Sequence, residues 1–444
     1  MIIDEINKFI EDLEYDNLSP TVINMTKHCL LDFIGSSFAG YQSKSAEIVL
    51  QSSVFLGEDG ECTVIGNGKT FSPLVAAFAN GTLASSLDID DGHRNAVGHP
   101  SSVVLPSLLA VVDSTDRIIR GKDFLTAMVA GYEIGIRSGI VMNSNHEQFF
   151  YGSGGWAIFG AAAGTSKLLM LKKNQLKNAL AISDAFRPTA QCEKSIKAGA
   201  MTKESVGWGS TTGLFSTLLA KDGFSGPDGI LQDDHLYNID ANHVLYSLGR
   251  EYKLEDIYFK QYPSCKWSHS SITAAIEIKK EYHPAIEDIE EVLIETFNKA
   301  VTLDHVAPET TEAAQYSIPF TVAVALCYGE LKPYHISDNN LGDKQVRNIA
   351  KKVRIVSNPE LEKLFPDKRP ARLSIRMAND KVFEKEVHVT RGDPEQPFTL
   401  VDIVDKFHAL THPYINKKQR NNIVEQVIHF ERINDVTHFT RLLQ

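Results

Sequence analysis

The pattern of apolar and polar positions divides the chain into two parts. From residue 1 to about 267 apolar residues recur at helical spacing, and segments 124–142 and 157–171 carry small or apolar residues on several faces, as buried helices do. Ser19-Pro20 and Ser72-Pro73 mark helix starts, because serine can cap a helix and proline fits its first turn. We therefore predict a close-packed helical domain in this part of the chain.

After Trp267 the pattern changes to short strands separated by helical segments. Residues 290–297 and 351–358 are rich in β-branched side chains, and alternating segments flank Asn379-Asp380, which predicts a hairpin. Residues 398–410 return to helical spacing. The predicted fold is mostly α: a large all-helical domain (1–267 and 395–444) with a smaller α/β lid domain (268–394). The crevice between the two domains is the expected ligand site.

Composition narrows the class of protein. The 444 residues carry a formal net charge of −11, which gives no general attraction to nucleic acid or to an anionic membrane. The five cysteines are scattered without a CxxC pair, which argues against a disulfide framework and a structural zinc site. The acidic N-terminal segment does not resemble a signal peptide, so we expect a cytoplasmic protein. An acidic ligand would need a locally basic pocket.

The stretch LDIDDGHRNAVGHP, residues 87–100, is the densest cluster of chemically active side chains. Asp88, Asp90 and Asp91 follow a predicted helix at its C-terminal end, where the helix dipole disfavours carboxylates unless cations such as Arg94 offset it. Such a local conflict often marks function, although Asp90 and Asp91 could equally accept hydrogen bonds from the loop. His99 precedes an apolar helix whose N-terminus would attract an anion. No further pair at ligand spacing accompanies the cluster, so we predict no metal.

Two cationic clusters follow. Lys203 opens a helix rich in small residues, whereas Lys194 and Lys197 are interpreted as parts of a solvated loop. The segment FKQYPSCKWSH, residues 259–269, lies at the predicted domain boundary and should face the crevice. Its Lys260, Lys266 and His269 could bind carboxylates or move protons, while Cys265 is interpreted as a small buried filler.

These clusters, in this order, resemble the MmgE/PrpD family, which includes 2-methylcitrate dehydratase, cis-aconitate decarboxylase and iminodisuccinate epimerase. The similarity spans nearly the whole chain and includes NGTLASSLDIDDGH, GHPSSVVLPSLLA, AMTKESVGWGSTTG and QYSIPF. It implies a large helical domain, an α/β lid, a homodimer, and an active site between the domains with no organic cofactor or metal. It also implies catalytic or carboxylate-binding roles at the positions of Asp88, His99, Lys203 and Lys260.

The chain departs from the decarboxylase-like branch of that family at four positions. Gly92, Cys265 and Phe320 stand where that branch is expected to have threonine, histidine and tyrosine, and Tyr151 stands at a further histidine position. These differences argue against cis-aconitate decarboxylation and, nearly as much, against methylcitrate dehydration. The segments FYGSGGWA and YPSCKWSH are closer in wording to the epimerase-like branch.

The chemistry shared by the family is proton transfer at a carbon next to a carboxylate, which requires cations that stabilise an enolate-like anion. We predict an iminodisuccinate epimerase-like isomerase acting on a small di- or tricarboxylate. A lyase and a catalytically inactive carboxylate-binding protein remain alternatives. Two groups among His99, Tyr151 and Lys203 would exchange the proton, with Asp88 orienting one of them. The predicted substrate-binding residues are Arg94, Lys260, Lys266, Asp91 and His269.

Overall fold

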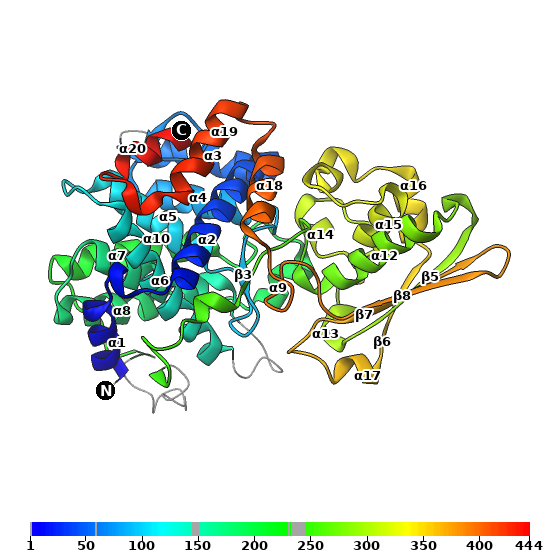
Figure 1. Cartoon of the computed structure of the whole chain (residues 1–444), viewed down its shortest axis with the longest axis horizontal. Helices are drawn as coiled ribbons and strands as arrows, with labels where there is room; N and C mark the ends of the chain where they lie inside the picture. Colours follow the sequence, from blue (N-terminus) through cyan, green and yellow to red (C-terminus); the bar gives the residue numbers. More distant parts are fainter. Residues whose placement is uncertain (1, 58–59, 144–150, 230, 232–244) are drawn as a thin grey trace.

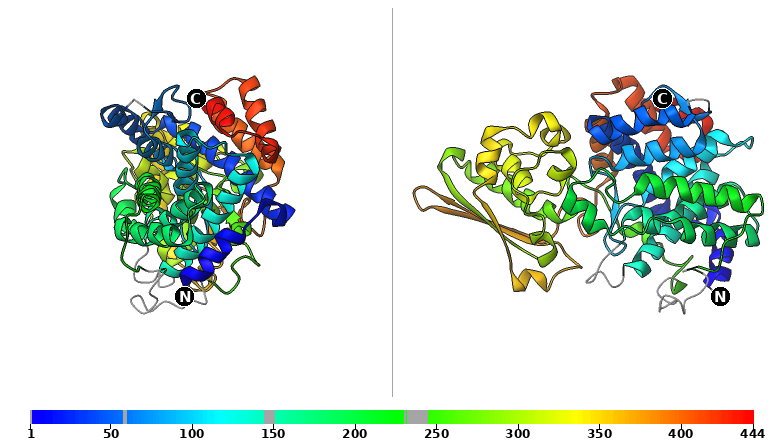
Figure 2. Two further views of the ribbon diagram at one scale, coloured as in Figure 1. Left: turned by 90° about the vertical axis from the view of Figure 1, so that its left-hand side faces the viewer. Right: turned by 180° about the vertical axis from the view of Figure 1, so that it is seen from behind.

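The computed structural model describes residues 2–57, 60–143, 151–229, 231 and 245–444, and it consists of a large helical domain beside a smaller α/β lid (Figure 1). Both chain termini lie on the helical domain, and the lid projects from one end of it (Figures 1 and 2). This arrangement confirms the predicted fold class. The helices of the large domain are α1 (Ile2–Asp12), α2 (Pro20–Ala39), α3 (Lys44–Gly57), α4 (Pro73–Ser85), α5 (Ser101–Ser114), α6 (Gly121–Met142), α7 (Ser153–Leu168), α8 (Lys173–Phe186), α9 (Cys192–Ala198), α10 (Val206–Lys221), α18 (Leu400–Thr411), α19 (Lys417–Ile428) and α20 (Thr437–Thr440).

Helices α6, α7 and α10 form the centre of the helical domain. The backbones of α6 and α7 approach closely, since a Cβ on Gly160 would lie 2.3 Å from the carbonyl oxygen of Gly131. This contact explains the small residues on several faces of these helices. Within the described part of the chain, only α6 is long and apolar enough to cross a membrane, and 94% of that window is buried inside the protein, as expected of a core helix.

The helix starts follow the sequence signals with one qualification. Ser19 caps α2, because its side chain accepts a hydrogen bond from the backbone nitrogen of Val22. Helix α4 begins at Pro73 as predicted, but the side chain of Ser72 makes no capping hydrogen bond. The predicted solvated loop around Lys194 and Lys197 instead contains the short helix α9.

The lid is built on a four-stranded sheet of order β6-β5-β7-β8. Strands β5 and β6 are parallel and the other pairs are antiparallel. Asp380 has φ +63° in the turn between β7 and β8, which confirms the hairpin at Asn379-Asp380. The lid elements are α12 (His269–Tyr282), β5 (Ile289–Thr296), α13 (Asn298–Val301), α14 (Thr311–Gln315), α15 (Ile318–Tyr328), α16 (Lys344–Ala350), β6 (Val353–Ser357), α17 (Pro359–Glu362), β7 (Ala371–Met377) and β8 (Val382–Val387).

Three connections join the domains. Helix α18 packs against α2, so the chain returns to the helical domain after the lid. Strand β3 (Gly92–His93) pairs with β4 (Ile257–Tyr258), which brings the loop after α4 next to the segment that leads into the lid. Leu87 and Ile89 pack in the same apolar cluster as the lid core. Asp88 is therefore fixed at the boundary between the two domains.

Candidate functional site

The carboxylate of Asp88 is the centre of the site. Asp88 is 2% exposed, and its Oδ1 lies 3.1 Å from Nζ of Lys260 and 3.4 Å from Nζ of Lys203. Nε2 of His99 lies 3.4 Å from the same oxygen. Burial by itself raises the pKa of Asp88, but the charges of Lys203 and Lys260 outweigh it and hold the pKa well below its usual range. Asp88 is therefore ionised at neutral pH.

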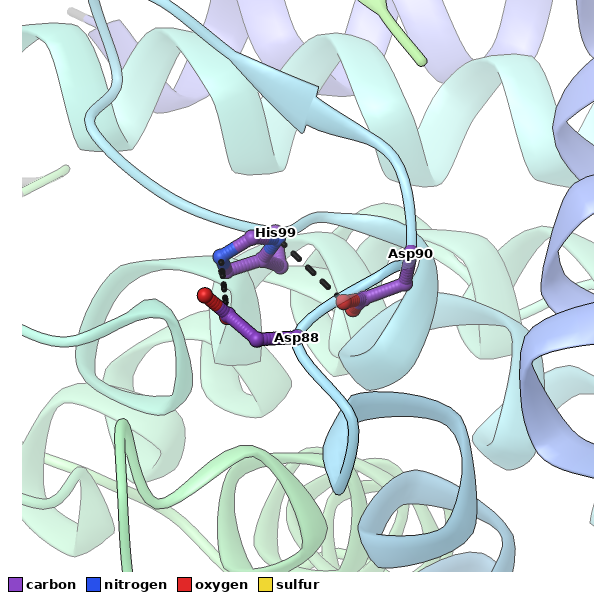
Figure 3. A group of neighbouring side chains, drawn as sticks. All are labelled: Asp88, Asp90 and His99. Carbon is purple, nitrogen blue, oxygen red and sulfur yellow. Dashed lines mark ion pairs between the residues drawn. The ribbon is translucent and has the colours of Figure 1, made fainter. Parts of the chain in front are cut away.

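The His99 ring is oriented by a backbone carbonyl. Its Nδ1 lies 2.7 Å from the carbonyl oxygen of Asp91. Because a carbonyl oxygen only accepts hydrogen bonds, Nδ1 carries the hydrogen of the neutral ring and Nε2 has the free lone pair. That Nε2 points towards Asp88 and lies 3.5 Å from Nζ of Lys260 (Figure 3). The ring is thus prepared to accept a proton at Nε2.

The backbone of His99 is held by a second network. Its N–H donates to Oγ of Ser153 over 2.7 Å, and the Ser153 hydroxyl donates to Oε2 of Glu204. Oε1 of Glu204 also lies 3.7 Å from Nε2 of His99. The sequence analysis missed both Ser153 and Glu204. The available signal was the position of Glu204 directly after Lys203, before a helix of small residues.

The backbone around the site is strained. Seven non-glycine residues in the described part of the chain have positive φ, and four of them, Asp88, Val97, Lys203 and Ser205, flank or form this site with φ between +43° and +56°. Each such conformation costs about 1–3 kcal/mol, and β-branched Val97 is especially disfavoured. Strain of this kind persists where the surrounding structure fixes a functional geometry.

A small cavity of about 40 Å³ lies between the domains at this point. It has room for a few water molecules. The helical domain contributes Asp88 and His99 to its wall, and the lid contributes Tyr316 and Arg369. The segment between the domains adds Tyr258, Lys260, Cys265 and Lys266. Cationic and proton-donating groups from three parts of the chain therefore meet in one space.

Burial tunes the titrating groups in this wall. It raises the pKa of Cys265 to about 12, with a further contribution from Asp88. It also raises the pKa of Tyr258 and of Tyr316 above the usual range, so the thiol and both phenols are hydrogen-bond donors at neutral pH. Burial lowers the pKa of Lys266 to about 8, although Asp393 at 2.9 Å opposes the shift.

Asp88, Asp90 and His99 bring metal-ligand atoms within 4.8 Å of one another. The two carboxylates, however, face different nitrogens of one ring: Asp88 faces Nε2, and Asp90 lies 3.5 Å from Nδ1 (Figure 3). One ion cannot bind both nitrogens of an imidazole. Two ammonium groups also contact Asp88 and would repel a cation. This donor set suits proton transfer better than metal binding.

Comparison with known proteins identifies the family. Residues 4–238 match the MmgE/PrpD N-terminal domain, and residues 262–429 match the MmgE/PrpD C-terminal domain. The chain belongs to the MmgE/PrpD family. The resemblance inferred from the sequence motifs is thereby confirmed at the level of the family.

Several known proteins are similar to this chain along most of its length. The cis-aconitate decarboxylase-like protein oryM of Aspergillus oryzae is 26% identical over 99% of this chain and 96% of its own length. A cis-aconitate decarboxylase of Aspergillus terreus is 25% identical over 99% of this chain and 95% of its own length. A probable 2-methylcitrate dehydratase of Saccharomyces cerevisiae is 24% identical over 83% of this chain and 76% of its own length. These relatives carry the names of lyases, and none of them is named as an epimerase.

Five of the nine predicted site residues of this MmgE/PrpD protein gather at the cavity. Asp88, His99, Lys260 and Lys266 line it. Lys203 lies behind Asp88, where its ammonium group donates to the carbonyl oxygen of Ser85 as well as facing the carboxylate. Lys203 therefore acts on the cavity through Asp88 and not from its wall.

Asp91 and His269 are buried near the site but lie outside the cavity wall. Asp91 accepts hydrogen bonds from the backbone nitrogen of Ser101 at 3.2 Å and from the Tyr132 hydroxyl at 2.8 Å, so it fixes the start of α5. Nε2 of His269 lies 3.3 Å from the carbonyl oxygen of Ser264. In this structure both residues organise the backbone around the site.

Arg94 and Tyr151 are also absent from the cavity wall, because each pairs with another side chain. The guanidinium of Arg94 makes two hydrogen bonds of 2.6 and 2.7 Å to the carboxylate of Glu395. The ring of Tyr151 lies 4.9 Å from the guanidinium of Arg187. Neither partner is adjacent in sequence, so the sequence pattern contained no signal of these pairs.

The structure changes the interpretation of Phe320, one of the four predicted departures from the decarboxylase-like branch. Phe320, taken as the replacement of an expected tyrosine, is fully buried in the lid core. Tyr316, four residues earlier in the QYS segment, brings a phenol to the cavity instead. The argument against lyase chemistry that relied on Phe320 is therefore weakened.

Proposed function

We propose that this MmgE/PrpD protein is an enzyme that transfers a proton at a carbon next to a carboxylate of a small di- or tricarboxylate, without a metal or organic cofactor. The observation that carries the proposal is the position of Nε2 of His99, 3.4 Å from the ionised carboxylate of Asp88 and 3.5 Å from the ammonium group of Lys260. A neutral imidazole with one fixed N–H is a suitable general base near neutral pH.

The groups around His99 support each part of this chemistry. Lys260 lines the cavity and would bind a substrate carboxylate and stabilise the enolate-like anion that forms when the adjacent carbon loses its proton. The imidazolium formed at the same time would be stabilised by Asp88, 3.4 Å away. Lys203 keeps Asp88 ionised from behind. Because Asp88, His99 and Lys260 are buried, each of these interactions is stronger than in solution.

The finer proposal is an iminodisuccinate epimerase-like isomerisation. Such a reaction needs a second group that returns a proton to the carbon. Tyr316 belongs to the lid and His99 to the helical domain, and the Tyr316 phenol stays protonated at neutral pH. We therefore prefer His99 and Tyr316 as the proton-exchanging groups, in place of the predicted two among His99, Tyr151 and Lys203.

Lyase chemistry is the second candidate, and the names of the relatives favour it. The same base would remove the proton, and a protonated phenol would assist a departing hydroxide or protonate the carbon after loss of CO2. Tyr316 supplies that phenol.

Proton NMR in D2O distinguishes these reactions. Iminodisuccinate, 2-methylcitrate, citrate and cis-aconitate would be offered separately to the purified protein. Deuterium incorporation beside a carboxylate of iminodisuccinate, with racemisation and no alkene signal, is the expected result. A new vinylic signal from a hydroxy acid would establish a dehydratase, and CO2 release from cis-aconitate a decarboxylase. No reaction with any of the four compounds would count against the proposal.

Homodimerisation and cytoplasmic location remain predictions. Light scattering on the purified protein would test the first, with a mass twice the 49.2 kDa of one chain as the expected value.

A further inference from the structure

We propose that Arg369 is the residue that recognises a second carboxylate of the substrate, from the lid side of the cavity. The inference rests on the proposed function only for the substrate class. It assigns to the lid a binding residue that no sequence motif indicated, and it requires the substrate to carry at least two separated carboxylates.

Arg369 is a buried guanidinium that forms no ion pair within 4 Å in the described part of the chain. The residue is 8% exposed and lines the cavity. Among the residues that the structure describes, no oxygen accepts a hydrogen bond from its guanidinium, and its Nε is fully buried without a partner. The guanidinium of Arg94, by contrast, donates two hydrogen bonds to the carboxylate of Glu395. A buried charge without a partner is costly, so an anion bound in the cavity would offset this cost.

The position of Arg369 is fixed by its surroundings. Arg369 lies two residues before the start of strand β7. Its carbonyl oxygen accepts a hydrogen bond of 2.5 Å from the hydroxyl of Ser270. Its guanidinium lies 5.6 Å from the centre of the Tyr258 ring. An aromatic contact of this kind restrains the plane of a guanidinium while leaving its N–H groups available to bind a carboxylate with two parallel hydrogen bonds.

The charges around the cavity form two groups. On the helical side, Lys260 and Lys203 share the carboxylate of Asp88. On the lid side, Asp393 lies 2.9 Å from Nζ of Lys266 and also acts electrostatically on Arg369, so two cations share one carboxylate. Glu204 also lines the cavity on the helical side, so the cations outnumber the carboxylates only in the lid group. A substrate with two carboxylates would place one at Lys260 and the other at Arg369 and so bridge the domains, whereas a monocarboxylate at Lys260 would leave Arg369 without an anion.

The test is calorimetric titration with two probes, tricarballylate and propionate, which have three carboxylates and one carboxylate and no hydroxyl group to eliminate. We expect Arg369→Gln to weaken tricarballylate binding about ten- to a hundredfold, as for loss of a charged hydrogen-bonded contact, and to change propionate binding less than twofold. Arg369→Lys should give an intermediate loss. Arg372→Gln, three residues along and paired with Glu386 on the surface, is the matched control and should bind as wild type does.

Three results would overturn the inference: no binding of tricarballylate by the wild type, unchanged binding in Arg369→Gln, or an equal loss for both probes. Thermal unfolding midpoints check that Arg369→Gln and Arg369→Lys are folded. The measurement involves no turnover, so it is separable from the NMR test. Loss of tricarballylate binding in Arg369→Gln would support the role of Arg369 even if the wild type showed no proton exchange. Proton exchange by the wild type together with unchanged tricarballylate binding in Arg369→Gln would overturn the role of Arg369 and leave the proposed function standing.

Discussion

Gly92 lies directly against the phenol ring of Tyr258. The two residues are register partners in the β3–β4 pair, and a Cβ on Gly92 would lie 2.4 Å from both Cζ and the hydroxyl oxygen of that ring. Tyr258 in turn lies in the cavity wall, and its ring contacts the side chains of Lys266 and Arg369. A threonine at position 92, as expected in the decarboxylase-like branch, would displace this ring. The position of the Tyr258 ring in the cavity wall therefore depends on glycine at position 92.

Gly92→Ala should move the Tyr258 ring and with it the groups on the lid side of the cavity. We expect tricarballylate binding to weaken about tenfold and the free energy of unfolding to fall by about 1–3 kcal/mol, as for other overpacking substitutions. Calorimetric titration and urea denaturation measure the two effects. Gly342→Ala is the control, because no atom lies within 4 Å of its added Cβ. An unchanged affinity in Gly92→Ala would show that the position of the Tyr258 ring is unimportant.

His99→Gln removes the base but keeps a side chain of similar length. We expect deuterium exchange into the substrate to slow about a hundred- to ten-thousandfold, the usual contribution of a general base. The measurement is the proton NMR time course with the substrate that wild type turns over. His388→Gln, at an exposed histidine that faces Glu386, should exchange at the wild-type rate. Exchange in His99→Gln at more than a tenth of that rate would assign the base to another residue.

Asp88→Asn leaves Lys203 and Lys260 buried without their carboxylate. At pH 7 we expect the free energy of unfolding to fall by about 3–5 kcal/mol, the usual cost of breaking a buried ion pair. The control is Asp380→Asn, at another aspartate with positive φ but on the surface. Urea denaturation at a series of pH values measures the difference.

The pH dependence of that difference has a definite sign. The folded pKa of Asp88 lies below its usual value of 3.8, so the carboxylate stabilises the fold fully above that value. Its contribution is lost as the pH falls through the folded pKa. The advantage of wild type over Asp88→Asn should therefore stay constant from about pH 8 to pH 5 and shrink below about pH 4. An advantage that shrinks near neutral pH would contradict this assignment.

Lys266 should make anion binding dependent on pH. Its pKa of about 8 means that its positive charge is lost as the pH rises through that value. Tricarballylate affinity of wild type should therefore decrease above about pH 8. Lys266→Arg keeps the charge at high pH and should remove this decrease, whereas Lys194→Arg at an exposed position should not. A decrease of equal size in Lys266→Arg would assign the titration to another group.

Much of this structure could be predicted from local sequence patterns. Helical spacing and Ser-Pro signals predicted the helical domain and the starts of α2 and α4, and alternation around Asn379-Asp380 predicted the lid hairpin. These features depend on interactions between residues close in the chain. The cluster of acids followed by His99 identified the centre of the site, because such a cluster at a helix end is unfavourable without cations nearby.

The tertiary structure alone decided which side chains face the cavity. Arg94, predicted to bind substrate, pairs with Glu395, 301 residues later, while Arg369, which no motif indicated, lies in the cavity wall with no hydrogen-bond partner for its Nε among the described residues. The physical reason is that the chain brings distant segments together and the direction of each side chain depends on its packed neighbours. The sequence by itself determined the family, the fold class and the charged residues available for chemistry. Only the packing of the lid on the helical domain decided which of those charges are neutralised by the protein and which remain for a substrate.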